Sequence, residues 1–134
     1  AKGAGKMDKE MQLPEAQLEV MQVIWDKGGK MMFSGLSEEL EARGREWKAN
    51  TILTLLSRLA HRGMISVVKR GRLNEYVARV SQEEYRQMQT RLLVDQVFGG
   101  DAKHLISALV KQDYLTEEDY DELKEFWKKG GGGT

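Results

Sequence analysis

Apolar residues in the first half of the chain recur at helical spacing. Residues 14–27 carry a broad apolar face behind a proline that suits the first turn of a helix, and residues 35–43 form a shorter amphipathic stretch that Ser34 can cap. Residues 49–62 have the clearest pattern, with a stripe at i, i+3, i+4 and i+7. That stripe consists of Ile52, Leu55, Leu56 and Leu59. We expect three helices packed around a shared core.

The third helical segment is followed by two stretches that favour β-structure. Residues 65–69 and 73–80 are rich in β-branched side chains and flank a turn at Gly71, where glycine supplies the positive φ that a tight turn needs. This pattern predicts a hairpin. The short apolar stretch 31–33 is a candidate edge strand.

Three further helices are expected after the hairpin, at residues 82–98, 102–113 and from Thr116 to about Lys129. Each begins with a capping signal. The signals are the capping box of Ser81 and Glu84, Asp101, and the capping box of Thr116 and Asp119. The expected fold is therefore mainly α with a small β-hairpin.

The amino-acid composition excludes some kinds of functional site and favours others. The 134 residues include 21 Lys and Arg, 21 Asp and Glu, and no Cys, which excludes disulfides, cysteine-based metal sites and a cysteine nucleophile. The zero net charge hides a basic segment, 42–79, with nine Lys or Arg against two Asp or Glu, whereas residues 81–134 are net acidic. A basic segment beside an acidic one is typical of a polyanion-binding part joined to a part with another task, although a solvated charged face is an open alternative.

Motifs for catalysis and for membrane insertion are absent from the sequence. His61 and His104 stand far apart with no third ligand at metal-binding spacing, and no phosphate-binding loop or nucleophile motif occurs. No apolar run approaches the length of about 18 residues that suggests a membrane span, and no signal peptide opens the sequence. We expect a protein that is not an enzyme and needs no metal or cofactor.

The order of elements favours binding to double-stranded DNA. An amphipathic helix, a short link, a helix with a short polar outer face and a hairpin with a cationic tip follow the order of a winged helix-turn-helix. A helix in the major groove presents small polar side chains to base edges and needs cations nearby for phosphates. The candidate DNA-binding residues are Lys48, Asn50, Thr51, Leu53, Thr54, Ser57, Arg58, Lys69, Arg70 and Arg72.

Two of these residue types suit particular bases. Asparagine pairs well with adenine, and Leu53, apolar on a polar face, can meet a thymine methyl group. The other interpretation of Leu53 is an ordinary exposed or half-buried leucine.

Three stretches of the sequence resemble one family of repressors. They are LPEAQLEVMQVIWDKG, EWKANTILTLLSRLAHRGMISVVKRGRLNEYVARVS and VFGGDAKHLISALVKQDYLTEEDYDELKEF. Over residues 13–127 the chain is similar to the penicillinase and methicillin-resistance repressors of the BlaI/MecI/CopY type. The resemblance implies a cytoplasmic homodimeric transcriptional repressor that occupies a palindromic operator with a recognition helix at 49–62 and a wing at 65–80.

The resemblance also implies a domain organisation. Residues 13–80 would form the winged-helix DNA-binding domain and residues 81–129 a three-helix dimerisation region, with flexible tails at 1–12 and 130–134. The implied dimer contacts are Tyr85, Met88, Leu92, Leu93, Val97, Leu105, Leu109, Leu123 and Trp127. An intrachain core is the alternative for these residues, but three short helices have too little interior for all of them, which favours a partner surface.

The sequence departs from the family pattern at three points. Lys48-Ala49 stand where the family usually has Ser-Pro before the recognition helix. Induction in the antibiotic-resistance members proceeds by cleavage of an Asn-Phe bond, and the matching positions here are Ala108 and Leu109. The absence of Cys excludes thiolate metal sensing. The inducer, and any regulatory protease or sensor, stays open, and so does a different use of the fold, as a protein-interaction module without sequence-specific DNA binding.

Overall fold

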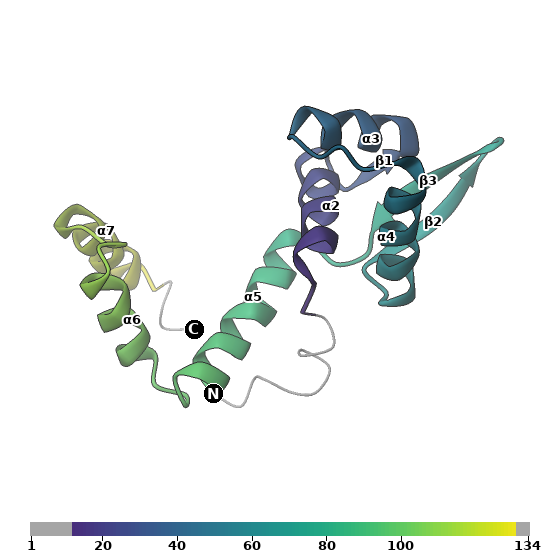
Figure 1. The fold of residues 1–134 in the computed structure, drawn as a ribbon. Helices are drawn as coiled ribbons and strands as arrows, with labels where there is room; N and C mark the ends of the chain where they lie inside the picture. Colours follow the sequence, from purple (N-terminus) through teal and green to yellow (C-terminus); the bar gives the residue numbers. More distant parts are fainter. Residues whose placement is uncertain (1–11, 131–134) are drawn as a thin grey trace. The chain divides into compact units, whose positions relative to one another are not determined.

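The computed structural model describes residues 12–130, and its contacts divide the chain into two compact units with the boundary between Leu92 and Leu93. In chain order the elements are α2 (Glu15–Asp26), β1 (Lys30–Met32), α3 (Phe33–Ala42), α4 (Ala49–His61), β2 (Ile65–Arg70), β3 (Leu73–Ala78), α5 (Gln82–Leu92), the short π-helical turn η1 (Leu93–Val97), α6 (Ala102–Lys111) and α7 (Glu117–Lys128). The expected mainly α fold is confirmed (Figure 1). The tails expected at 1–12 and 130–134 lie almost wholly outside the described residues.

A three-stranded antiparallel sheet forms the wing and its base. The strand order is β1-β3-β2, so the stretch expected as an edge strand does pair with the hairpin, with Lys30 opposite Val77. In the hairpin, Arg70 lies opposite Leu73 across a two-residue turn that begins at Gly71, whose φ is 66°. A positive φ at the first turn residue is what a type II′ hairpin turn requires, and glycine adopts it without a steric penalty.

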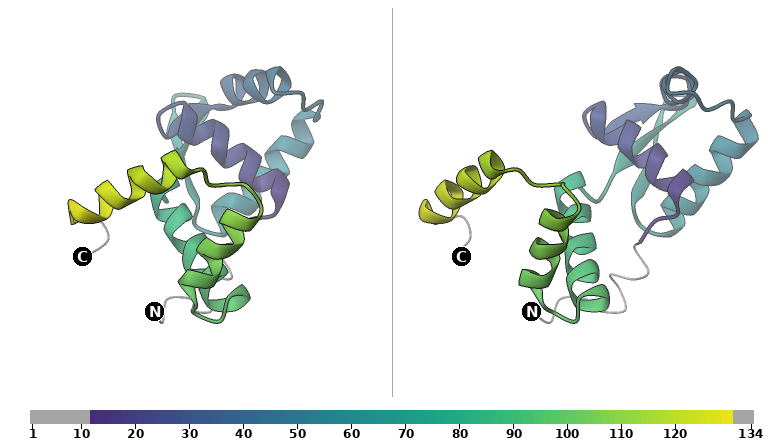
Figure 2. Two further views of the ribbon diagram at one scale, coloured as in Figure 1. Left: turned by 90° about the vertical axis from the view of Figure 1, so that its left-hand side faces the viewer. Right: turned by 60° about the vertical axis from the view of Figure 1, so that its left-hand side comes forward.

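Helices α2, α3 and α4 pack with this sheet to form the core of the first unit (Figures 1 and 2). The stripe predicted on α4 is confirmed, because all four of its apolar residues are buried. Fully buried side chains also come from α2 and α3, among them Met21, Ile24 and Leu36. The polar face of α4 is therefore left outside, since its leucines are held against α2.

Helix α5 belongs to the first unit by its contacts, which places the unit boundary beyond the expected end of the winged-helix domain at residue 80. Tyr85 is only 5% exposed and sits in the core, where its hydroxyl accepts a hydrogen bond of 3.0 Å from the backbone N–H of Leu13. Its ring lies 5.7 Å from that of Trp25, whose indole Nε1 donates to the carbonyl of Val80 at 2.9 Å. These contacts tie the start of α5 to α2.

The second unit comprises η1, α6 and α7. The predicted caps are confirmed: the Asp101 side chain accepts from the N–H of His104, and Thr116 and Asp119 form a reciprocal capping box. Neither α6 nor α7 contains a buried residue. The helix expected over 82–98 changes character at Leu93, where the N–H of Phe98 bonds to the Leu93 carbonyl at the five-residue spacing of a π-turn.

The start of α3 differs from the expectation. Helix α3 begins at Phe33, with Met32 as an N-cap that makes no side-chain hydrogen bond, so the cap expected from Ser34 is wrong. The β1–β3 pairing ends at Met32, and the helix starts directly after it.

Between Gln12 and Gly130, every helix is too short or too polar to cross a lipid bilayer.

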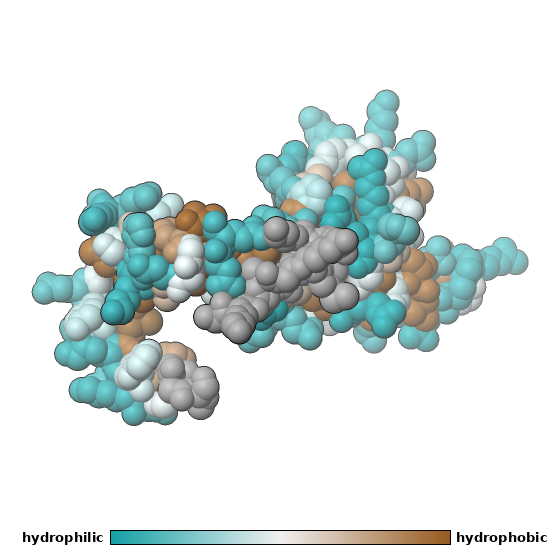
Figure 3. Space-filling view, turned by 90° about the horizontal axis from the view of Figure 1, so that it is seen from below, coloured by the Kyte–Doolittle hydropathy of each residue, from teal (hydrophilic) through white to brown (hydrophobic). Residues whose placement is uncertain are grey.

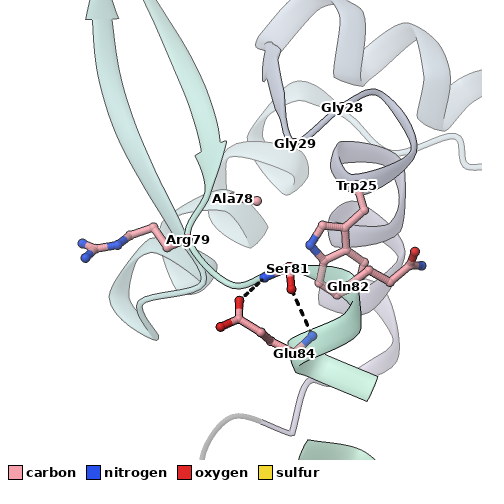
Figure 4. A pocket seen from close by; sticks show the side chains of 8 residues that line it. All are labelled: Trp25, Gly28, Gly29, Ala78, Arg79, Ser81, Gln82 and Glu84. Atoms are coloured by element: carbon pink, nitrogen blue, oxygen red, sulfur yellow. Dashed lines mark hydrogen bonds between the residues drawn. The ribbon is translucent and has the colours of Figure 1, made fainter. Parts of the chain in front are cut away.

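The capping box at the start of α5 yields a prediction about stability (Figure 4). The Ser81 N–H donates to Glu84 at 2.8 Å and the Glu84 N–H donates to the Ser81 hydroxyl at 3.0 Å, which confirms the predicted box. Ser81→Ala should lower the free energy of unfolding by about 1 kcal/mol, the usual cost of removing an N-cap. Urea unfolding followed by circular dichroism measures this, with the exposed Gln87→Ala as the control.

The same box makes stability depend on pH. The hydrogen bond from the Ser81 backbone holds the pKa of Glu84 below its usual range. A carboxyl with a lowered pKa stabilises the fold above its unfolded pKa, and this contribution disappears as the pH falls through the folded pKa. Glu84→Gln should therefore be less stable than the wild type near neutral pH and equally stable in acid. An equal gap at both pH values would contradict this.

Candidate nucleic-acid interface

Helix α4 presents a continuous polar face beside its buried stripe. Asn50, Thr51, Thr54 and Ser57 are all exposed, and Leu53 is 44% exposed in their midst. All five side chains are short or of medium length and uncharged, which suits close approach to base edges. The side chains proposed from the sequence for this helix are thus accessible.

The N-terminus of α4 favours an anion. Lys48 is the N-cap residue in an extended conformation, and no side chain caps the helix, so the first backbone N–H groups are unoccupied by side-chain acceptors. Unpaired N–H groups and the helix dipole attract phosphate, and the exposed Lys48 adds a full positive charge beside them. Replacing the usual Ser-Pro by Lys48-Ala49 has therefore exchanged a side-chain cap for a cation.

The tip of the hairpin carries three exposed cations, and they differ in their partners. Figure 1 shows the β2–β3 hairpin projecting past α4. Arg70 pairs with Glu75 of β3, with 3.0 Å between Nε and Oε1. Lys69 and Arg72 are exposed and form no ion pair with any residue from 12 to 130. The wing therefore offers two unpaired charges and one that is partly neutralised.

Two arginines of the basic segment form ion pairs with acidic residues of the same chain. Arg43 pairs with Asp26 at 2.9 Å and with Glu39 at 3.1 Å, and its hydrogen bond holds the pKa of Glu39 below the usual range. Arg45 donates from Nε to Glu19 at 2.7 Å and stacks over the Trp47 ring at 4.7 Å. These two charges link α3 and the following loop to α2 and are not offered to a polyanion.

A basic depression lies at the C-terminal half of α4. Its volume is about 420 Å³, and its walls include Arg58, His61 and Arg62 together with the buried Gln17 of α2. Arg58 and His61 are exposed, so the polar face of α4 becomes cationic towards its end, as expected. Sequence patterns pointed to Arg58 but not to Gln17, because only the packing of α2 against α4 brings Gln17 to this depression.

The comparisons with known proteins agree with this geometry. The family model for the penicillinase repressor matches residues 13–129. The chain belongs to the penicillinase repressor family. It is 28% identical over 117 residues to the penicillinase repressor of Bacillus licheniformis, covering 87% of this chain and 90% of that protein. It is 25% identical over 122 residues to the methicillin resistance regulatory protein MecI of Mammaliicoccus sciuri, covering 91% and 98%.

Solved structures of a member of the family also match this chain. The solution structure of the DNA-binding domain of the repressor BlaI is 34% identical and covers 55% of this chain and 88% of that domain, with a TM-score of 0.49. The family consists of transcriptional repressors rather than enzymes, and this chain is a DNA-binding repressor of the winged-helix type. Within residues 12–130, no three His, Asp or Glu side chains are grouped to hold a metal ion.

The residues that the family resemblance assigned to dimer contacts fall into three groups. Tyr85 is a core residue of the first unit, Met88 packs half-buried against that core and Leu92 is buried. Leu105 and Leu109 are half-buried. The exposed members are Leu93, Val97, Leu123 and Trp127.

The second unit exposes more apolar surface than the family pattern alone suggested. Besides the predicted residues, large exposed side chains include Ile106, Val110, Tyr114, Tyr120 and Phe126. Their exposed fractions lie between 53% and 71%. On the face of the molecule seen in Figure 3, hydrophobic residues in brown lie interspersed among hydrophilic ones. Tyr120 could have been predicted from the sequence, because its spacing from Leu123 and Trp127 places it on the same side of the helix.

The positions that match the family's cleavage site lie inside a regular helix. Ala108 and Leu109 are both in α6 and both half-buried. Backbone in a hydrogen-bonded helix is a poor substrate for a protease, because the chain must first unwind locally. The residues at these two positions, Ala and Leu, differ from the Asn-Phe pair that the family resemblance implies.

Proposed function

We propose that this repressor acts as a homodimer that occupies a palindromic operator, each protomer placing α4 in the major groove. The observation that carries the proposal is the exposed, uncharged face of α4 between the Lys48 cation and the basic end of the helix. A groove-binding helix needs this arrangement, because base edges are read by short polar groups while phosphates on either side attract cations. We assign Asn50 to a contact with adenine, the base that an asparagine side chain pairs with best.

The backbone contacts are assigned to the N-terminus of α4, to Arg58 and to the wing. Lys69 and Arg72 at the hairpin tip are unpaired among the described residues and can follow the phosphates beside the groove. Such contacts set the register of the protein on DNA but carry no sequence information. The repressor would work in the cytoplasm by excluding other proteins from the promoter.

The dimer contacts are assigned to the exposed apolar residues of the second unit. Contiguous apolar surface on a soluble protein is usually covered by a partner, and a two-fold dimer covers it on both copies at once. A symmetric dimer places its two recognition helices about one helical turn of DNA apart, or a multiple of it, which accounts for a palindromic operator. Leu93, Val97, Leu123 and Trp127 are the residues we assign to this surface.

Selection of bound sequences from a pool of random duplexes tests the proposal. We expect a recovered motif with two inverted half-sites, whose spacing reports the distance between recognition helices. Failure to retain any duplex at low salt would contradict DNA binding and favour a protein-interaction module. A single half-site without symmetry would contradict the dimer alone.

The wing yields a further prediction. Arg72→Ala should weaken binding to every duplex alike and reduce the slope of log K against log salt concentration by about 0.9 for each phosphate that the variant no longer neutralises. Arg70→Ala should have a smaller effect, because Glu75 already neutralises part of that charge. Fluorescence anisotropy at several salt concentrations measures both. Equal effects of the two variants, or a changed base preference, would contradict the assigned roles.

A further inference from the structure

The centre of the exposed α4 face carries two adjacent residues with methyl groups. Asn50, Leu53, Thr54 and Ser57 follow the i, i+3, i+4, i+7 spacing and so share one side of the helix. All four are exposed. Leu53 is the one wholly apolar side chain of this set, flanked along the helix axis by the polar Asn50 and Ser57.

The hydroxyl proton of Thr54 is already used within the helix. Its Oγ1 donates to the backbone carbonyl of Asn50 at 2.9 Å. A threonine hydroxyl has a single proton, so Thr54 has none left to donate to a base. What it offers outward is its γ-methyl group and the hydroxyl lone pairs. Thr90 of α5 makes the same bond, to the carbonyl of Arg86 at 2.8 Å, and is equally exposed.

Leu53 and Thr54 thus place apolar groups side by side in the middle of a surface proposed to face base edges. In the major groove the one apolar group displayed by the bases is the C5-methyl of thymine. We infer that Leu53 and Thr54 together form a thymine-methyl contact site, which determines sequence specificity at the centre of each half-site. This inference rests on the proposed function and identifies the base feature that α4 reads.

Such a site would recognise a base by its methyl group and not by its hydrogen-bonding groups. A methyl contact separates thymine from uracil, two bases that present the same hydrogen-bonding groups in a duplex. Asn50, one turn earlier on the helix, would read its adenine by hydrogen bonds instead. The half-site is therefore expected to contain at least one position where the methyl group, and not the hydrogen-bonding pattern, decides affinity.

The test uses the full chain and the duplex recovered by selection, resynthesised with uracil in place of one thymine at a time. Each replacement removes a single methyl group and leaves every hydrogen-bonding group in place. At one or two positions per half-site, uracil should weaken binding about fourfold, which is what one buried methyl group contributes. Replacements outside the half-sites should change nothing. Fluorescence anisotropy measures each dissociation constant.

Variants of Leu53 and Thr54 test whether these two residues cause the preference for thymine over uracil. Leu53→Ala and Thr54→Ser each remove methyl groups and should bind the thymine and uracil duplexes with more nearly equal affinity. Thr54→Val keeps a methyl group and removes the hydroxyl, so its preference for thymine over uracil should persist. Thr90→Ser and Thr90→Val repeat these changes on α5 and should leave the thymine preference at its wild-type value.

The outcomes separate the inference from the function that it rests on. A protein that selects an operator but binds thymine and uracil duplexes equally at every position would overturn the methyl contact and leave the repressor intact. A Thr54→Val variant that loses the thymine preference while Thr54→Ser keeps it would also overturn the inference, because the hydroxyl would then be the reading group. A protein that selects no sequence would contradict the proposed function itself.

Discussion

Replacing Leu123 by aspartate together with Trp127 by aspartate is expected to convert the repressor into a monomer with operator affinity at least about 100-fold lower. Both side chains are exposed within the chain, at 51% and 68%, so the change should leave the protomer fold intact. A buried charge in an apolar interface is costly unless it is paired. Loss of the partner also makes the second half-site contact a separate event, and linked binding contributes about 10²–10⁴ in affinity.

Sedimentation velocity and anisotropy on the selected operator measure the two effects, with circular dichroism as the check on folding. Glu125→Ala changes an exposed polar residue of the same helix and should leave both the mass and the affinity at wild-type values. A double variant that stays dimeric would place the interface elsewhere. A monomer that binds the operator as tightly as the wild type would show that each protomer recognises DNA without its partner.

Truncation of Tyr85 to alanine is expected to destabilise the first unit by about 3–5 kcal/mol, the usual cost of removing a buried aromatic ring. The ring is 5% exposed, and it packs beside Trp25. Tyr85→Phe keeps the ring and removes the acceptor of the Leu13 N–H, so it should cost about 1–3 kcal/mol by leaving that N–H unpaired. The larger effect therefore comes from packing.

Urea unfolding followed by tryptophan fluorescence measures both changes, because Trp25 lies against the tyrosine. Gln87→Ala on the same helix is exposed and should change the free energy of unfolding by less than about 0.5 kcal/mol. If Tyr85→Ala instead left stability unchanged and abolished dimerisation, Tyr85 would be an interface residue after all. That result would support the expectation drawn from the family resemblance.

Both predictions depend on the same distinction between the two units. The first unit has a closed core, which buries most of the apolar residues of α2 to α5. The second unit has apolar residues on α6 and α7 but none that is buried. Truncation of a core residue in the first unit should therefore act through stability, and a charge placed on the exposed apolar residues of the second unit should act through association.

The secondary structure could be predicted closely because its signals are local. The buried stripe of α4, the turn at Gly71 and the three capping signals of the later helices all depend on residues within a few positions of one another. The exposed polar residues of α4 followed from the same periodicity, since a helix with one buried face must expose the other. The Ser34 cap failed because strand pairing at Met32, a tertiary contact, determines where α3 begins.

Local sequence patterns predict the order of helices and strands, the exposed face of α4 and the family of the chain. Which charged side chains and aromatic rings have partners depends instead on contacts between distant parts of the chain. Arg45 is neutralised by Glu19, 26 positions earlier, and Tyr85 bonds to Leu13 across 72 positions. Periodicity reports which side of an element is apolar, but whether a side chain has a partner depends on distances that only the packed chain defines.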